Sequence, residues 1–162
     1  MQQAERDQDS IPPSTIVEPT EEGPALRDAA AAALRAEQDE ADAAEARRRF
    51  HDEPLALIPP DDALATHLLS GEGVHSQRRS AILRGPGDDR ALGFGGTLYL
   101  TSRRLIHLGQ VMVTVQLTDI VETSLAGERL LLALRNGEGM AFDLDRPRLL
   151  RAEIAAATRA LR

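Results

Sequence analysis

The chain of 162 residues contains no cysteine, no tryptophan and only one tyrosine. Without cysteine, disulfide bonds and thiolate metal sites are excluded, and this composition fits a reducing compartment. Lysine is absent as well, since all 19 basic residues are arginine. We interpret that bias as the mark of a high-GC genome, such as those of actinobacteria, rather than as a chemical preference.

Long apolar runs are also missing. No stretch approaches the roughly 20 residues that a helix needs to span a bilayer. The polar N-terminus, MQQAERDQDS, has no basic segment followed by an apolar one, so it is not typical of a secretory signal. The sequence therefore predicts a cytoplasmic protein that can meet a membrane only peripherally.

The net charge of −7 is unevenly distributed. Residues 1–53 hold 14 acids and 6 arginines, a net charge of −8, whereas residues 54–162 hold 12 acids and 13 arginines, a net charge of +1. A nucleic-acid-binding protein normally carries a strongly basic domain. Neither part of this chain is one, so no nucleic-acid partner is expected.

Composition divides the chain into four parts. Residues 1–24 are acidic, contain four prolines and offer too little apolar surface to offset the entropy of ordering, so we expect a disordered tail. Residues 25–50 are rich in alanine and predict a helix. Residues 51–62 predict a proline-rich linker, and residues 63–162 predict a single domain.

The predicted helix over residues 25–50 has a thin apolar face, mostly alanine with Leu26, Leu34 and Phe50. Two interpretations stay open. Its poor amphipathicity favours a solvated helical spacer. The alternative is a helix that pairs with a partner or with another copy of the chain.

Two shorter helices are predicted from their capping residues. Asp61 or Asp62 is expected to cap a short helix that ends at Gly71. Asp145 is expected to cap a final helix, with Pro147 in its first turn. The apolar stripe of that final helix comprises Leu150, Ile154, Ala157 and Leu161.

From Val74 onward the pattern changes to strands separated by turns. Residues 74–84 predict a first strand, and RGPGDDRALGFGG predicts a glycine-rich loop after it. Residues 96–108 read GTLYLTSRRLIHL, a hairpin with two arginines in its middle. Opposed residues of an antiparallel pair face the same side, so the register can be tested by asking which pairing gives one apolar face.

A three-residue turn over residues 102–104 pairs Leu100 with Ile106 and gives such a face, whereas a two-residue turn mixes polar and apolar residues on both faces. We therefore expect the three-residue turn, which leaves Arg103 and Arg104 exposed.

Two later hairpins follow from their glycines. Gly109-Gln110 is expected to form a two-residue loop that pairs Ile106 with Val113 and turns Val111 inward. Around Asn136-Gly137 an odd-numbered loop is preferred. It aligns Leu130, Leu132 and Leu134 with Met140, Phe142 and Leu144.

The predicted architecture is mainly β. Six or seven antiparallel strands with one apolar face are closed by the C-terminal helix, and they are preceded by the disordered tail and the alanine-rich helix. The apolar face has to be covered, either by curling into a barrel or by adding a second sheet.

The order of LLSGEGVHSQ, GTLYLTSRRLIHLG, VQLTDI and RLLLALRNGEGMAFDL before a closing helix resembles GRAM and bacterial PH-like domains. The resemblance covers roughly residues 63–162. It implies a PH-superfold barrel of two near-orthogonal sheets with a C-terminal helix. It also implies a role in binding membranes, lipid headgroups or peptides. The loop after the first strand carries Asp88 and Asp89, so it lacks the dense basic cluster of phosphoinositide-binding PH domains.

Candidate site residues are few. Arg78, Arg79, Arg103 and Arg104 are candidates for an anion or lipid headgroup site, because guanidinium groups grip phosphate bidentately. The alternative is that they are ordinary solvated or ion-paired corners. The four histidines have no metal-ligand spacing, and no serine lies in a nucleophile elbow. We therefore expect no catalytic residues, no metal and no cofactor.

These patterns predict a non-catalytic PH/GRAM-like module whose partner is a protein or peptide segment. Two alternatives stay open. One is binding to an anionic membrane headgroup, and the other is self-assembly through the N-terminal helix. The sequence does not fix the oligomeric state.

Overall fold

The computed structural model describes residues 22–84 and 91–162. The tail predicted for residues 1–24 lies outside these residues except for its last three, and Asp88 and Asp89 lie outside them too. The helices are α1 (Glu22–Asp52), α2 (Asp62–Ala65), the short 3₁₀ helix η1 (Leu117–Asp119) and α3 (Pro147–Arg159). The strands are β1 (Val74–Arg84), β2 (Ala91–Thr101), β3 (Arg104–Gly109), β4 (Val113–Gln116), β5 (Ile120–Ala126), β6 (Arg129–Leu134) and β7 (Gly139–Leu144).

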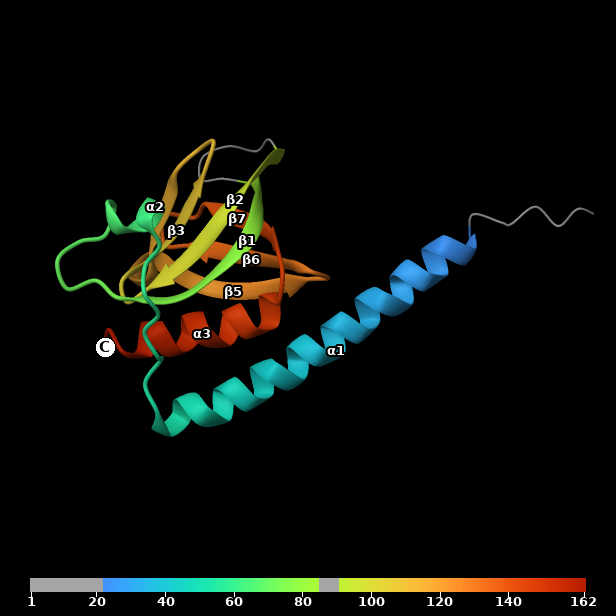
Figure 1. Cartoon of the computed structure of the whole chain (residues 1–162), viewed down its shortest axis with the longest axis horizontal. Helices are drawn as coiled ribbons and strands as arrows, with labels where there is room; N and C mark the ends of the chain where they lie inside the picture. The colour runs from blue at the N-terminus through green and yellow to red at the C-terminus, as the bar shows by residue number, and fades with distance from the viewer. Residues whose placement is uncertain (1–21, 85–90) are drawn as a thin grey trace, which may run out of the picture.

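The seven strands form one antiparallel sheet in the order β4-β3-β2-β1-β7-β6-β5. The long strand β1 pairs with β2 along most of its length and with β7 near its end, so it joins two groups of strands. The sheet curls around its inner face, and α3 lies along one side of it (Figure 1). The predicted PH-like fold is confirmed, with β4 and β5 at the two ends of the sheet.

The main core lies inside the curled sheet, as the apolar alternation of its strands predicts. Six of the seven strands contribute buried apolar side chains to this core, and β5 adds half-buried ones. From α3, the predicted residues Leu150, Ile154 and Ala157 are buried here, but Leu161 is 42% exposed because α3 ends before it. The stripe was therefore predicted one turn too long.

The predicted register of the β2–β3 hairpin is wrong. Leu100 pairs with Leu105 and Tyr99 with Ile106, so the turn contains only Ser102 and Arg103. The expected register rested on the assumption that only one face of the hairpin is apolar, whereas this hairpin is buried on both faces. The pairing of Leu100 with Leu105 faces the main core, and that of Tyr99 with Ile106 faces a second cluster outside the sheet.

That second cluster is covered by residues 53–73, which we call the outer strap. Leu64 of α2 is fully buried there, and Ile58 and Leu68 pack against it. The strap is tied to β1 by the Ile58 N–H, which donates to Val74 O at 2.8 Å. The proline-rich linker predicted for residues 51–62 begins later than expected, because α1 continues to Asp52, and within it Leu55 and Ile58 pack against the two apolar clusters.

Three local expectations have mixed outcomes. Asp61 caps α2 as predicted, but α2 ends at Ala65 rather than near Gly71. β2 begins at Ala91, inside the predicted glycine-rich loop. In the β3–β4 hairpin Ile106 pairs with Thr114 rather than Val113, which shifts the register by one residue and leaves Val111 38% exposed.

The β6–β7 hairpin confirms its prediction. Leu132 pairs with Met140 and Leu130 with Phe142. The three-residue loop ends at Gly137, which has a φ of +88°. That left-handed backbone conformation suits glycine because it has no Cβ. In this hairpin one face is apolar and the other is not, so the pairing that gives one apolar face is the correct one.

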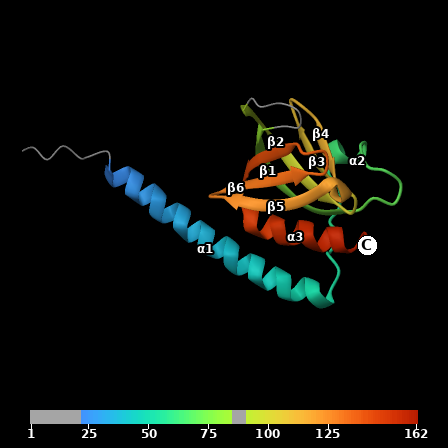
Figure 2. The ribbon, with the colours of Figure 1, turned by 180° about the vertical axis from the view of Figure 1, so that it is seen from behind.

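Helix α1 docks on α3 through its second half, and the two helices run side by side in the same direction (Figures 1 and 2). Asp39 of α1 is 3% exposed, and its carboxylate accepts hydrogen bonds from Arg148 N at 2.7 Å and Leu149 N at 2.9 Å. The prediction that Asp145 caps α3 is therefore wrong. The N-cap position is Arg146, which has a positive φ and no capping side chain. The solvated-spacer interpretation is wrong for this half of α1.

Close contact between β2 and β3 generates a stability prediction. A Cβ on Gly96 would lie 2.3 Å from Leu108 O and 2.7 Å from His107 Cε1, whereas a Cβ on Gly95 would meet nothing within 4 Å. Gly96→Ala is expected to lower the free energy of unfolding by about 1–3 kcal/mol, as overpacking does. Gly95→Ala is the matched control and should change it by less than about 0.5 kcal/mol. Urea unfolding of both variants measures the difference, and equal losses would contradict it.

The capping of α3 by Asp39 generates a second prediction. Asp39→Ala leaves two N–H groups at the start of α3 without their acceptor, which is expected to cost about 1–2 kcal/mol. Amide exchange should speed up over the docked half of α1 and the first turn of α3. Asp28→Ala, on the exposed first half of the same helix, is the control. Unchanged exchange at α3 in Asp39→Ala would show that the cap is dispensable.

Candidate functional site

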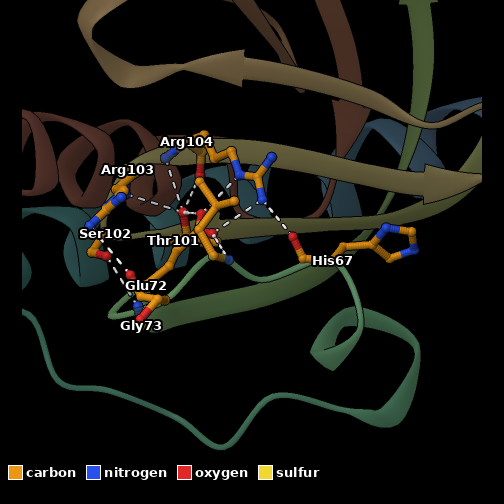
Figure 3. A network of polar contacts seen from close by, with 9 residues as sticks. His67, Glu72, Gly73, Thr101, Ser102, Arg103 and Arg104 are labelled. Carbon is orange, nitrogen blue, oxygen red and sulfur yellow. Dashed lines mark hydrogen bonds and ion pairs between the residues drawn. The ribbon is translucent and has the colours of Figure 1, made fainter.

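The hairpin arginines were the leading candidates, and the structure separates them. Arg104 begins β3 and is 9% exposed. Its guanidinium group faces Glu72, with Nε donating to Oε1 at 2.9 Å and Nη2 to Oε2 at 3.1 Å (Figure 3). A third bond runs from Nη2 to His67 O at 2.7 Å. The expectation that Arg104 is exposed in the turn is therefore wrong.

Further polar contacts complete this network around the Glu72 side chain, which is fully buried. Thr101 Oγ1 donates to Glu72 Oε1 at 2.7 Å, and Leu69 N donates to Oε2 at 2.9 Å. Next to it, Ser102 N donates to Gly73 O at 2.8 Å and Gly73 N to Ser102 Oγ at 3.1 Å. The network joins the end of the outer strap to the β2–β3 turn.

Two titratable groups of the strap region have shifted pKa values. Burial of the Glu72 carboxyl raises its pKa, but hydrogen bonds from Arg104, Leu69 N and Thr101 outweigh burial and hold the pKa below its ordinary value of 4.5. The pKa of Tyr99 is raised to about 12, first by burial of its hydroxyl and then by the Asp61 carboxylate to which that hydroxyl donates. Glu72 is thus ionised and Tyr99 neutral at pH 7, as their hydrogen bonds require.

Arg78 is also engaged internally. Its Nη2 donates to Glu153 Oε2 at 2.9 Å, and both side chains are close to 90% buried. Its Nη1 donates to Arg146 O at 2.9 Å. Arg78 therefore ties β1 to the start of α3, and its guanidinium group faces a carboxylate rather than solvent.

The other two candidates, Arg79 and Arg103, are exposed. Arg79 lines a shallow hollow over β1, β2 and β7 together with Asp143 and Asp145, and Arg103 lies in the hairpin turn, where its Nη2 approaches Ser70 O at 3.5 Å. Of the four arginines, two are thus held by carboxylates. Anion binding at this set stays a prediction.

The described part of the chain contains no candidate metal-ion site. Within residues 22–84 and 91–162, no three histidine or acidic side chains gather closely enough to hold a metal ion. His107 is 1% exposed and lies in the main core against Phe142, with ring centroids 6.4 Å apart. The expected register, with Ile106 on the apolar inner face, would instead put the neighbouring His107 on the outer face.

The feature best placed to bind a partner is the free edge of β5. Among the described strands, β5 pairs only with β6, and α3 runs beside it. Val121 is 64% exposed, and Arg151 Nε of α3 donates to Thr123 Oγ1 at 3.2 Å across the gap between helix and strand.

A cavity of about 430 Å³ lies at the start of this strand. Asp119 directly precedes β5, and Leu134 pairs with its first residue, Ile120. The other lining residues come from β4 and the β6–β7 hairpin, namely Thr114, Val115, Gln116, Arg135, Asn136 and Glu138. Sequence reasoning missed this cavity because its two walls are about 20 residues apart in the chain and neither carries a motif.

The contrast between Arg104 and Arg103 can be tested. Arg104→Gln removes the cation from a buried carboxylate and is expected to cost about 3 kcal/mol of unfolding free energy at pH 7, whereas Arg103→Gln should cost less than about 0.5 kcal/mol. Because the pKa of Glu72 is lowered by folding, its ionised form stabilises the protein above pH 4.5, and that contribution is lost as pH falls below 4.5. The gap between wild type and Arg104→Gln should therefore shrink in acid. A gap independent of pH would exclude Glu72 as its cause.

No helix within residues 22–84 and 91–162 is both long and apolar enough to cross a membrane. No family model matches the sequence, so the resemblance to GRAM domains stays a prediction. No curated protein is detectably similar in sequence.

Among solved structures 24 chains match, one of them described as the Vps36 N-terminal PH domain. It is 18% identical with a TM-score of 0.48, and the alignment covers 58% of this chain and 85% of that chain. A likeness of this degree carries no argument about what the chain binds. The description as PH-like rests on the seven antiparallel strands and the closing helix themselves.

Proposed function

We propose that the chain is a non-catalytic binding module that accepts an extended protein segment on the free edge of β5, beside α3. The observation that carries this proposal is that β5 is a seven-residue strand with one hydrogen-bonded neighbour among the described strands. An unpaired edge presents a row of N–H and C=O groups that an added strand can satisfy.

The groups available on this edge follow from the β5–β6 hairpin. Ala126 pairs with Arg129 across the two-residue turn, so these two form a hydrogen-bonded pair. Hydrogen-bonded and non-hydrogen-bonded pairs alternate along an antiparallel ladder. Ser124 therefore directs its N–H to β6, whereas Thr123 and Leu125 direct theirs to the free edge.

Side chains near the edge supply specificity. The exposed Val121 offers an apolar contact, and Arg151 offers a cation beside Thr123. The cavity next to Asp119 can hold one side chain of the bound segment. A bound strand would thus gain affinity from main-chain hydrogen bonds and selectivity from these contacts.

Charge favours a protein over an anionic membrane as the partner. The domain over residues 54–162 has a net charge of only +1. Two of its four candidate arginines, Arg78 and Arg104, are paired with carboxylates. Attachment to anionic lipid needs a cluster of unpaired basic residues near the surface, each worth about 1 kcal/mol.

The test uses peptides selected for binding to the full-length chain from a random-sequence display library, followed by amide exchange of the complex. Binding should slow exchange at Thr123 and Leu125 at least about 10-fold, as new hydrogen bonds form there. Ser124 is the internal control, because its N–H is already bonded to β6. Val121→Lys is expected to weaken the binding of the selected peptides.

Two results would contradict the proposal. One is protection that appears away from β5, for example at β4, on binding of every selected peptide. The other is salt-sensitive binding to vesicles of anionic phospholipid that is lost in the Arg79→Ala/Arg103→Ala double variant, which would favour a membrane headgroup as the ligand.

A further inference from the structure

Helix α1 has two halves with different surroundings. One face of α1 carries buried or half-buried side chains that recur every three or four residues, the spacing of a helix face packed along a neighbouring element. They are Ala32, Ala36, Asp39, Ala43, Ala46 and Phe50. The first half extends past the curled sheet into solvent (Figures 1 and 2).

The projecting half, residues 25–38, is about 20 Å long at 1.5 Å per residue. It carries Leu26 and Leu34, which are 69% and 67% exposed. At about 100° per residue, these two leucines lie on the side of the helix roughly opposite its buried face. The domain of the same chain therefore cannot cover them, because it lies against the other side of α1.

We propose that this half of α1 binds the same half of a second copy in an antiparallel pair. In an antiparallel register centred on Ala30, Leu26 of each copy faces Leu34 of the other, and the two Ala30 residues meet at the axis. The interface is thus self-complementary, as a two-fold dimer requires. Alanines at the centre allow the two helix backbones to approach closely.

Charges select this orientation. In the antiparallel register Arg27 of one copy lies one helical turn from Glu37 of the other, close enough for an ion pair, and this contact occurs twice. Glu37 lies on the same side of the helix as Leu26. In a parallel pair it would face Glu37 of the other copy, and the two carboxylates would repel each other. Because only about 14 residues per chain take part, the dimer is expected to be weak and to form in the micromolar range.

Sedimentation equilibrium of the full-length chain tests this proposal, which does not depend on the peptide site. The average mass should rise from monomer to dimer with concentration. Leu26→Arg and Leu34→Arg should each raise the dimer dissociation constant at least about 10-fold. Leu57→Arg is the matched control, since Leu57 is 66% exposed but lies on the outer strap. Circular dichroism shows whether each variant stays folded. A monomer at all concentrations, or equal loss in the control, would overturn the proposal.

Orientation can be read by cross-linking, because the natural chain has no cysteine. Under oxidation, Leu26→Cys and Leu34→Cys chains should form disulfide-linked dimers when mixed and not when each is alone. Self-linking of the Leu26→Cys chain would show a parallel pair instead. Arg27→Glu should weaken the dimer, and the double variant Arg27→Glu/Glu37→Arg should restore it. Failure of that restoration would exclude the ion pair.

Discussion

Burial of the β2–β3 pair on both faces is the constraint from which much of the structure follows. The inner face packs in the main core and the outer face against Leu64, Ile58 and Leu68 of the outer strap. A strand pair buried on both faces admits apolar residues at consecutive positions, which is why LYL and LI occur here. The strap must then be held in place, and the ion pair between Glu72 and Arg104 does so at its end. The arginine that seemed available for an anion is therefore part of the fold.

The same constraint explains where sequence reasoning succeeded and failed. Parity arguments assume that one face is apolar and the other solvated. That holds for β6 and β7, and the register around Gly137 was predicted correctly. This assumption fails for β2 and β3. The proline-rich segment about 30 residues earlier covers their outer face, and no pattern in its sequence predicts that. The succession of strands and the closing helix needed only local patterns and were predictable, whereas the pairing of β1 with β7 joins distant segments and was not.

Helix α1 shows a second limit of local patterns. Its alanine-rich face has little amphipathicity, so the sequence favoured a spacer, yet alanine suits close packing of two helices. The contact that fixes its position is Asp39 at the N-terminus of α3, across 109 residues of sequence. Local reasoning gave that capping role to Asp145, the nearest carboxylate. Long-range caps of this kind have no sequence signature, and the docking of α1 could be found only in three dimensions.

Packing also limits which surfaces are left for partners. The strap covers the outer face of β2 and β3, and α1 covers one flank of α3. In the described part of the chain this leaves the edges of β4 and β5 and the projecting half of α1 open to partners, and of the two edges that of β5 is the longer strand and lies beside α3. The β5 edge and the projecting half of α1 lie at different places, so one can be occupied without blocking the other. Antiparallel pairing of α1 would put one curled sheet at each end of the helix pair. Two β5 edges carried by one dimer would bind a partner with repeated segments more tightly than either edge alone, because the second contact is made at high effective concentration.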